Sequence, residues 1–177
     1  MRKTLLQGLI RRPLTEPAPQ AGDPELAELA AQLSQTARAT LGRSLAIRHV
    51  DAGSCNACEL ELHALGNAFY DLERFGFKFV ASPRHADVLL VTGPVTRNMA
   101  EALRRTYDAM PAPKWVVAAG GCALDGGIFA GSYAVLGGVA AVVPVDLHIP
   151  GCPPSPLTLL KGLLALMMRA PGDAEES

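Results

Sequence analysis

The sequence predicts an open α/β fold in which helices cover a parallel sheet. Short apolar runs alternate with helical segments from Ser44 onward, as in strands joined by right-handed crossovers. Two of these runs, VLLV and WVVAA, are apolar throughout, which is typical of strands covered on both faces. The chain has 177 residues, of which 49% are hydrophobic, so it is long enough for one domain with its own core.

The N-terminal part precedes this pattern. Residues 1–24 are predicted to form a tail, because basic residues begin it and four prolines interrupt the rest. Asp23 and Pro24 then read as a helix N-cap followed by proline at the first helical position. Leucines recur after them at helical spacing and Gly42 is a typical stop, which predicts a helix within residues 25–43.

The α/β domain is predicted to span residues 44–170, followed by an acidic tail at 171–177. The expected strands are residues 45–50, 77–81, 87–92, 114–119 and 142–149. The expected helices are residues 59–70, 96–110 and 155–169.

Composition and charge exclude several classes of protein. A formal net charge of −1 excludes a broadly basic nucleic-acid-binding protein, so no nucleic-acid partner is expected. Charged residues make up 19%, below the roughly 25% of a typical soluble domain, which indicates apolar surface suited to a protein partner. The most apolar stretch, residues 157–170, is shorter than the ~20 residues of a membrane-spanning helix and contains Lys161. The N-terminus is a poor signal peptide, so a cytoplasmic location is expected.

Four cysteines lie in glycine- or proline-rich loops that directly follow predicted strands. Cys55 and Cys58 form a C-x-x-C pair, Cys122 follows two glycines, and Cys152 follows a proline and a glycine. The carboxyl ends of parallel strands share one edge, where open α/β sheets bind their ligands. We therefore expect the four thiols to converge in space.

Several chemistries compete for these cysteines. A four-thiolate zinc site usually takes two C-x-x-C pairs, and only one is present. A redox pair of Cys55 and Cys58 leaves Cys122 and Cys152 unexplained, and unrelated core cysteines fit such loops poorly. A [4Fe–4S] cluster needs four thiolates and is the interpretation that the pattern favours. Neighbouring glycines then let backbone N–H groups approach the cluster sulfurs.

Four stretches of the sequence carry a resemblance to a known family. They are SPRHADVLLVTG (residues 82–93), ALRRTYDAMP (102–111), GCA (121–123) and VPVDLHIPGCPP (143–154). They closely resemble the 20 kDa subunit family of respiratory complex I. That family includes the small subunits of membrane-bound, energy-converting [NiFe] hydrogenases and formate hydrogenlyases. The resemblance covers about residues 44–169.

One departure from the complex I pattern narrows the resemblance to one branch of the family. The complex I subunits carry two adjacent cysteines at the first position, whereas Asn56 and Ala57 separate Cys55 from Cys58 here. The stretch GSCNACELE is similar to the hydrogenase branch, as in formate hydrogenlyase small subunits. The resemblance thus implies a flavodoxin-like fold whose one [4Fe–4S] cluster, bound by Cys55, Cys58, Cys122 and Cys152, faces a large catalytic subunit.

The resemblance also implies partners and a location. Electrons would pass between a ferredoxin-like multi-cluster subunit and a [NiFe] site or a quinone pocket, and this chain would not be catalytic alone. Membrane subunits of the same complex would hold it, as a peripheral subunit, at the cytoplasmic face of the cell membrane. One alternative is the 20 kDa-type subunit of a complex I-like NADH- or ferredoxin-quinone oxidoreductase. A non-redox zinc-binding or assembly module is the alternative of a different class.

Two glutamates follow the C-x-x-C pair. Glu59 and Glu61 either stabilise the next helix by interacting with its positive N-terminus or relay protons. Glu61 occupies the position that matches the glutamate found after the paired cysteines in the family that the sequence resembles. Arg84 either eases reduction of a nearby cluster or forms a surface salt bridge. We expect Asp125 and Asp146 to order the cluster loops as hydrogen-bond acceptors. The histidines His63 and His85 are expected to be ordinary polar residues.

Overall fold

The computed structural model describes residues 28–29, 31–32, 35 and 43–168. The two predicted tails, residues 1–24 and 171–177, lie outside the described residues. Of the predicted helix within residues 25–43, the described positions 28, 29, 31, 32 and 35 are helical, and most of the remainder lies outside.

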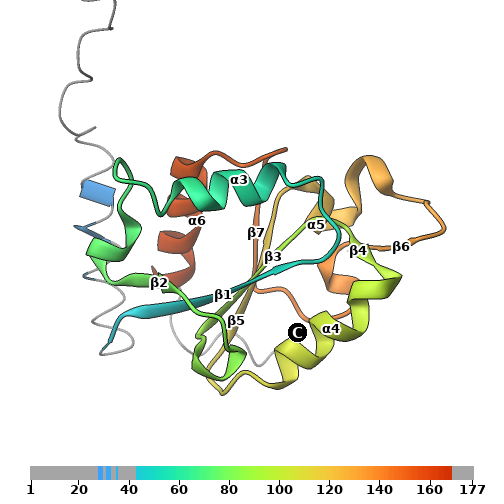
Figure 1. Ribbon diagram of the computed structural model, residues 1–177, viewed down its shortest axis with the longest axis horizontal. Coiled ribbons are helices and arrows are strands. Elements are labelled where there is room, and N and C mark those ends of the chain that lie inside the picture. Colours follow the sequence, from blue (N-terminus) through green and yellow to red (C-terminus); the bar gives the residue numbers. More distant parts are fainter. Residues whose placement is uncertain (1–27, 30, 33–34, 36–42, 169–177) are drawn as a thin grey trace, which may run out of the picture.

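A five-stranded parallel sheet forms the centre of the described structure (Figure 1). In spatial order its strands are β2 (Phe77–Phe79), β1 (Leu45–Asp51), β3 (Val88–Thr92), β5 (Trp115–Ala119) and β7 (Leu147–Ile149). Every neighbouring pair is parallel. Counted along the chain, the order is 2-1-3-4-5, which is the flavodoxin-like order. The predicted fold class is confirmed.

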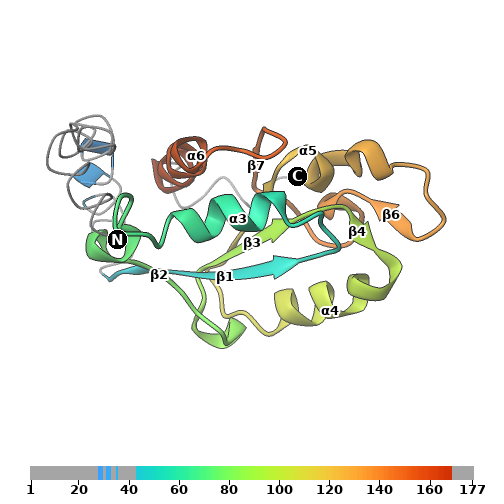
Figure 2. The same ribbon diagram turned by 45° about the horizontal axis from the view of Figure 1, so that its top comes forward.

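Helices cover both faces of this sheet (Figure 2). Helices α3 (Ala57–Ala64) and α6 (Pro156–Met168) lie on one face, and α4 (Arg97–Asp108) lies on the other. Leu62 of α3 and Leu163 of α6 belong to one core, whereas Leu103 of α4 belongs to the second. In the part of the chain that the structure describes, no helix is both long and apolar enough to cross a membrane.

Strand β3 shows why an apolar run folds into the middle of the sheet. All five of its residues are buried. Val88 and Leu90 point into the core beneath α3 and α6, while Leu89 and Val91 point into the core beneath α4. Side chains alternate between the two faces of a strand, so a strand covered on both faces needs apolar residues at every position.

Helix α3 is shorter than the predicted helix of residues 59–70. It begins at Ala57 and ends at Ala64, because the chain turns at Gly66 and Asn67. The Asn67 side-chain oxygen accepts the backbone N–H groups of Phe69 at 2.9 Å and Tyr70 at 3.0 Å. This local bonding competes with the helix, as asparagine side chains do at turns.

Two predicted strands are also shorter in the structure. The run at residues 142–149 forms β7 only from Leu147, because a 3-10 helix at Val139–Ala141 and Pro144 precede it. The run at residues 77–81 leaves the sheet after Phe79, with a last bond from the Val80 N–H to the Ile47 carbonyl at 2.8 Å.

Two short strands and a short α-helix were not predicted. Strands β4 (Val95–Thr96) and β6 (Val135–Gly137) form a small antiparallel ladder, and α5 (Gly121–Asp125) begins directly after β5. Each is too short to show a period in the sequence. Helix α5 matters most for function, because it carries Cys122.

Candidate functional site

The loop after β1 is built to present two thiols. Asp51, the last residue of β1, accepts the backbone N–H groups of Gly53 at 2.8 Å and Ser54 at 2.7 Å. The Ser54 hydroxyl in turn accepts the N–H of Asn56 at 3.1 Å. This turn leads directly into α3, so that Cys55 is exposed in the loop and Cys58 is buried in the first turn of the helix.

The loops after β5 and β7 are bonded to each other. The Gly120 N–H donates to the Ile149 carbonyl and the Gly121 N–H donates to the Gly151 carbonyl, both at 2.8 Å. These bonds extend the β5–β7 pairing past the ends of the strands. Cys122, half-buried in α5, and Cys152, exposed after Gly151, are thereby held at the same edge of the sheet.

Electrostatics show that the four thiols share one region. The pKa of Cys58 is raised to about 11, first by burial and then, in decreasing order, by the charges of Glu59, Cys55, Cys122 and Cys152. Burial is also the largest cause that raises the pKa of Cys122, and the charges of Cys152 and Cys55 are the next two causes. Without a metal these two thiols are therefore protonated at neutral pH, whereas a bound cation reverses this because coordinated thiols are deprotonated.

Backbone groups come unusually close to two of the sulfurs. A Cβ atom at Gly120, whose φ is +94°, would lie 3.0 Å from the Cys58 Sγ. A Cβ at Gly127, with φ +51°, would lie 2.7 Å from the Cys122 Sγ, and the next N–H, of Ile128, bonds to that sulfur and lowers the pKa of Cys122. Glycine at both positions keeps a side chain out of the thiol region.

The donor set fits an iron–sulfur cluster. Four thiols in one region, glycines next to two of the sulfurs and an N–H bonded to the Cys122 sulfur suit the thiolate ligation and backbone hydrogen bonding of such a cluster. Within residues 43–168 and the few described residues before them, no three His, Cys, Asp or Glu side chains are arranged to hold a single metal ion.

The two glutamates have different surroundings. Glu59 is only 6% exposed and accepts hydrogen bonds from the hydroxyls of Ser54, at 2.6 Å, and Thr92. Glu61 is half-buried on the same helix. Glu59 is thus a buried carboxylate beside Cys58, which the sequence pattern alone did not distinguish from Glu61.

Arg84 does not lie beside the cysteines, which is one of its two expected positions, and Asp146 does not lie beside the cysteine loops, where it was expected. Arg84 is exposed in a 3-10 helix, Pro83–His85, that precedes β3, so it lies at the edge of the sheet opposite to the thiols. Asp146 precedes β7 and accepts the Val116 N–H at 2.6 Å, also at that opposite edge. Strand β3 alone separates the two edges by about 17 Å, at ~3.3 Å per residue. Arg84 therefore does not lie beside the cysteines, whereas Asp125 accepts the Gly127 N–H at 2.8 Å and orders the Cys122 loop as expected.

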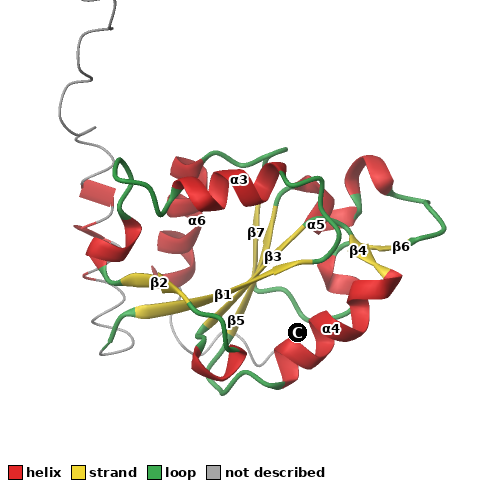
Figure 3. Cartoon of the chain, in the orientation of Figure 1, coloured by secondary structure: helices red, strands yellow, loops and turns green. Residues whose placement is uncertain are grey.

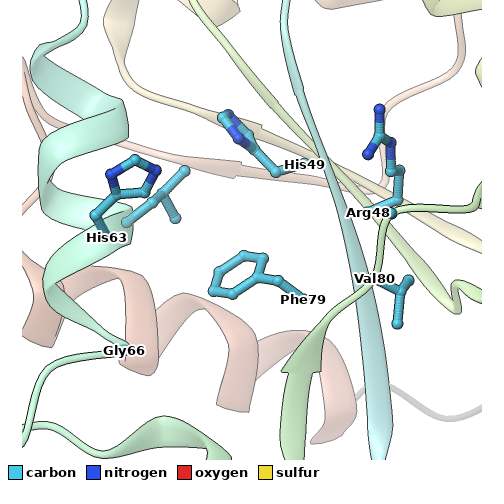
Figure 4. A pocket seen from close by; sticks show the side chains of 8 residues that line it. Arg48, His49, His63, Gly66, Phe79 and Val80 are labelled. Atoms are coloured by element: carbon cyan, nitrogen blue, oxygen red, sulfur yellow. The ribbon is translucent and has the colours of Figure 1, made fainter.

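Sequence reasoning missed His49 and Thr92. The His49 Nε2 lies 2.9 Å from the Thr92 Oγ1, and the two residues come from neighbouring strands β1 and β3. His49 also borders a cavity of about 500 Å³ between β1, α3 and the end of β2, together with His63 and Phe79 (Figure 4). Thr92 belongs to the stretch of residues 82–93 that carries the family resemblance, but no motif marks His49, and only the register of the two strands brings the two residues together.

Fold and site define a class: a flavodoxin-like α/β protein with four thiols at the carboxyl edge of its sheet. A match to a family model assigns the chain more closely than this structural class does. Residues 55–166 match the family model described as NADH ubiquinone oxidoreductase, 20 Kd subunit, and the chain belongs to this family. It is therefore an oxidoreductase subunit.

The solved structures that are similar to the chain include the following two. A membrane-bound sulfane sulfur reductase, described as an archaeal respiratory membrane complex, has 35% sequence identity and a TM-score of 0.63 over 77% of this chain and 73% of that chain. The [NiFeSe] hydrogenase of Desulfovibrio vulgaris Hildenborough has 19% identity and a TM-score of 0.46 over 72% of this chain and 66% of that chain.

Proposed function

We propose that this chain is an electron-transfer subunit that holds one [4Fe–4S] cluster through Cys55, Cys58, Cys122 and Cys152. It relays electrons to or from the large catalytic subunit of a group 4 [NiFe] hydrogenase, in a formate hydrogenlyase-like complex. The observation that carries this proposal is the approach of four thiols from three loops to one edge of the sheet. Membership of the family supports it.

The residues of the chain position the cluster and set its surroundings. The turn at Asp51 and Ser54 fixes the C-x-x-C pair, and the bonds from Gly120 and Gly121 hold the other two loops beside it. The Ile128 N–H on Cys122 stabilises the thiolate form of that ligand. The bound cluster supplies one-electron transfer.

The spacing of the first two cysteines supports the hydrogenase branch. Asn56 and Ala57 separate them, and the left-handed conformation of Asn56, φ 72°, lets the chain turn between Cys55 and Cys58. The family description favours a second candidate, the 20 kDa-type subunit of a complex I-like NADH- or ferredoxin-quinone oxidoreductase with a quinone site. The candidate of a different class is a zinc-binding or assembly module.

The proposed complex also contains a ferredoxin-like multi-cluster subunit and membrane subunits, at the cytoplasmic face of the membrane. The sulfane sulfur reductase that resembles this chain is described as a membrane complex, which supports a peripheral place in such an assembly. No nucleic-acid partner is proposed.

Glu59 and Glu61 are the proposed proton-relay candidates. Hydrogen or quinone chemistry moves protons with electrons, and Glu59 is the buried member of the pair. We expect that replacing the relay residue by glutamine lowers hydrogen-dependent dye reduction at least tenfold while iron content stays unchanged. Comparing Glu59→Gln with Glu61→Gln on this assay identifies the relay, and full activity in both variants excludes it.

The complex itself gives the decisive test. The tagged chain is purified without oxygen together with its native partners, and nickel, iron, sulfide, zinc and hydrogen-dependent dye reduction are measured on one sample. Nickel with hydrogen-dependent activity, and iron and sulfide for one cluster per chain, support the hydrogenase proposal. Iron without nickel or hydrogen turnover indicates the quinone-linked candidate, and stoichiometric zinc indicates the module without redox function.

A further inference from the structure

The carboxylate of Glu59 receives two short hydrogen-bond chains. On one side, the Asn56 N–H donates to the Ser54 hydroxyl, which donates to Oε2 of Glu59 at 2.6 Å. On the other side, the Thr92 hydroxyl donates to Oε1 of Glu59, and the His49 Nε2 lies 2.9 Å from that hydroxyl oxygen. Both carboxylate oxygens are thus occupied by hydroxyl donors.

The number of protons available in the Thr92–His49 contact determines which ring nitrogen of His49 is protonated. A threonine hydroxyl has one proton, and here Thr92 donates it to Glu59. The Thr92 oxygen therefore accepts from His49, whose ring must carry its proton on Nε2. Burial lowers the pKa of His49, so the neutral ring with this single N–H is the form present at pH 7.

Glu59 in turn acts on a cluster ligand. It is the residue after Cys58 at the start of α3, and its carboxylate is buried there, with only 6% of the residue exposed. A buried negative charge next to a ligand sulfur opposes an added electron on a cluster bound there. The position of the Glu59 carboxylate therefore affects the reduction potential.

We propose that His49 is a positioning residue that fixes the Glu59 carboxylate through Thr92 and thereby keeps the reduction potential of the cluster low. The inference rests on the proposed function, because it requires a cluster at Cys58. It adds a role for two residues, on β1 and β3, that touch no cysteine in the described contacts. Figure 4 shows the His49 ring extending from β1 toward α3, the helix that carries Glu59.

The test is a redox titration of the cluster EPR signal in the intact complex. We expect His49→Leu to raise the midpoint, so that the ratio of reduced to oxidised cluster at the wild-type midpoint rises about threefold. This ratio corresponds to about 28 mV for a one-electron couple, at 59 mV per tenfold change. Thr92→Val keeps the shape of the buried side chain but removes the hydroxyl, and it should give the same shift.

Two variants separate positioning from a general loss of structure. Glutamine places an amide N–H close to the position of Nε2, so His49→Gln should restore the wild-type midpoint and line shape. His63→Leu changes the other histidine of the same cavity, which has no bond to Thr92, and should leave the midpoint unchanged.

A double-mutant cycle shows whether His49 acts through Glu59. Glu59→Gln alone should raise the midpoint, and His49→Leu should then add no further shift. A wild-type midpoint in His49→Leu, an equal shift in His49→Gln, or a full additional shift in the Glu59→Gln background each overturns the inference. If the wild-type complex has no iron–sulfur signal, the proposed function fails with it. A wild-type signal with an unaffected His49→Leu variant overturns only the role of His49.

Discussion

At the scale of single residues, the site depends on four sulfurs with unequal surroundings. Cys58 is buried and Cys122 half-buried, whereas Cys55 and Cys152 are exposed. Metal binding changes the protonation state of Cys58 and Cys122 most, because burial keeps these two thiols protonated when no metal is bound. Site formation and thiol chemistry are therefore coupled in this protein.

This coupling predicts a difference in alkylation. In metal-depleted protein at pH 8, a pKa of about 11 leaves only ~0.1% of Cys58 as the reactive thiolate. Iodoacetamide should therefore modify exposed Cys55 well before Cys58, and raising the pH toward 11 should remove the difference. Mass spectrometry of the two thiols measures both rates. Equal rates at pH 8 contradict the described burial of Cys58.

Replacing one ligand should remove the cluster. Cys122→Ser and Cys152→Ser each leave three thiolates, so we expect loss of the [4Fe–4S] EPR signal and of most of the iron in both variants. Ser155→Ala, three residues after Cys152 and not a ligand, is the matched control and should retain the iron, because the printed contacts of its hydroxyl are with Thr158 in α6. An unchanged signal in both cysteine variants rules out this ligand set.

At the scale of elements, the start of β1 is attached to the start of β3 through Asp87. Asp87 is 3% exposed, and its carboxylate accepts hydrogen bonds from the two terminal guanidinium nitrogens of Arg43, Nη1 and Nη2, and from the Ala46 N–H at 2.9 Å. Arg43 is largely exposed, so the ion pair itself contributes little. The bond to the buried Ala46 N–H is the larger contribution, because an unpaired buried donor costs about 1–3 kcal/mol.

The two partners of this contact should therefore respond differently to substitution. We expect Asp87→Ala to lower the free energy of unfolding by about 2 kcal/mol, and Arg43→Ala by less than about 1 kcal/mol. Urea denaturation followed by circular dichroism measures both. Equal losses would show that the ion pair, rather than the Ala46 bond, holds the two strands together.

The sequence predicts the long apolar elements and misses features that depend on short contacts. Strand β3 was predicted because every residue of VLLV is apolar, as is typical of a strand that is covered on both faces of a parallel sheet. Helix α3 was predicted too long because a bond from the Asn67 side chain to the next turn ends it, and periodicity does not report such a bond. The cysteines were predicted as a group because glycine and proline mark the loops at strand ends. The contact of His49 with Thr92 joins residues far apart in the sequence, so only the strand register reveals it.

At the scale of the whole molecule, exposed apolar side chains are concentrated in the segment that follows Cys122 along the chain. Ile128 is 85% exposed and Tyr133 is 91% exposed, and both belong to the segment between α5 and β6 (Figure 3). Leu124 in α5 and Leu136 in β6 are also exposed. An apolar surface next to a cluster is suited to the subunit that exchanges electrons with it.

This surface should be needed for assembly with the large subunit. We expect Ile128→Asp to reduce recovery of the large subunit with the tagged chain at least fivefold, because it places a charge in an apolar contact. The Ile128 N–H remains, so iron in the chain should be retained. Phe69→Asp, which alters an exposed aromatic residue between α3 and β2, is the control and should leave recovery unchanged. Normal assembly of Ile128→Asp would place the partner elsewhere.

The distribution of the thiols along the chain also determines when the site can exist during biosynthesis. Cys55 and Cys58 emerge from the ribosome early, but Cys152 follows β7, the last strand of the sheet. The bonds that hold the loop of Cys122 beside that of Cys152 form only when β7 has paired with β5. A nascent chain thus has an incomplete set of thiols until its whole sheet is closed. For the proposed cluster, insertion of iron and sulfide would therefore be a maturation step that follows folding, with both delivered to a finished domain.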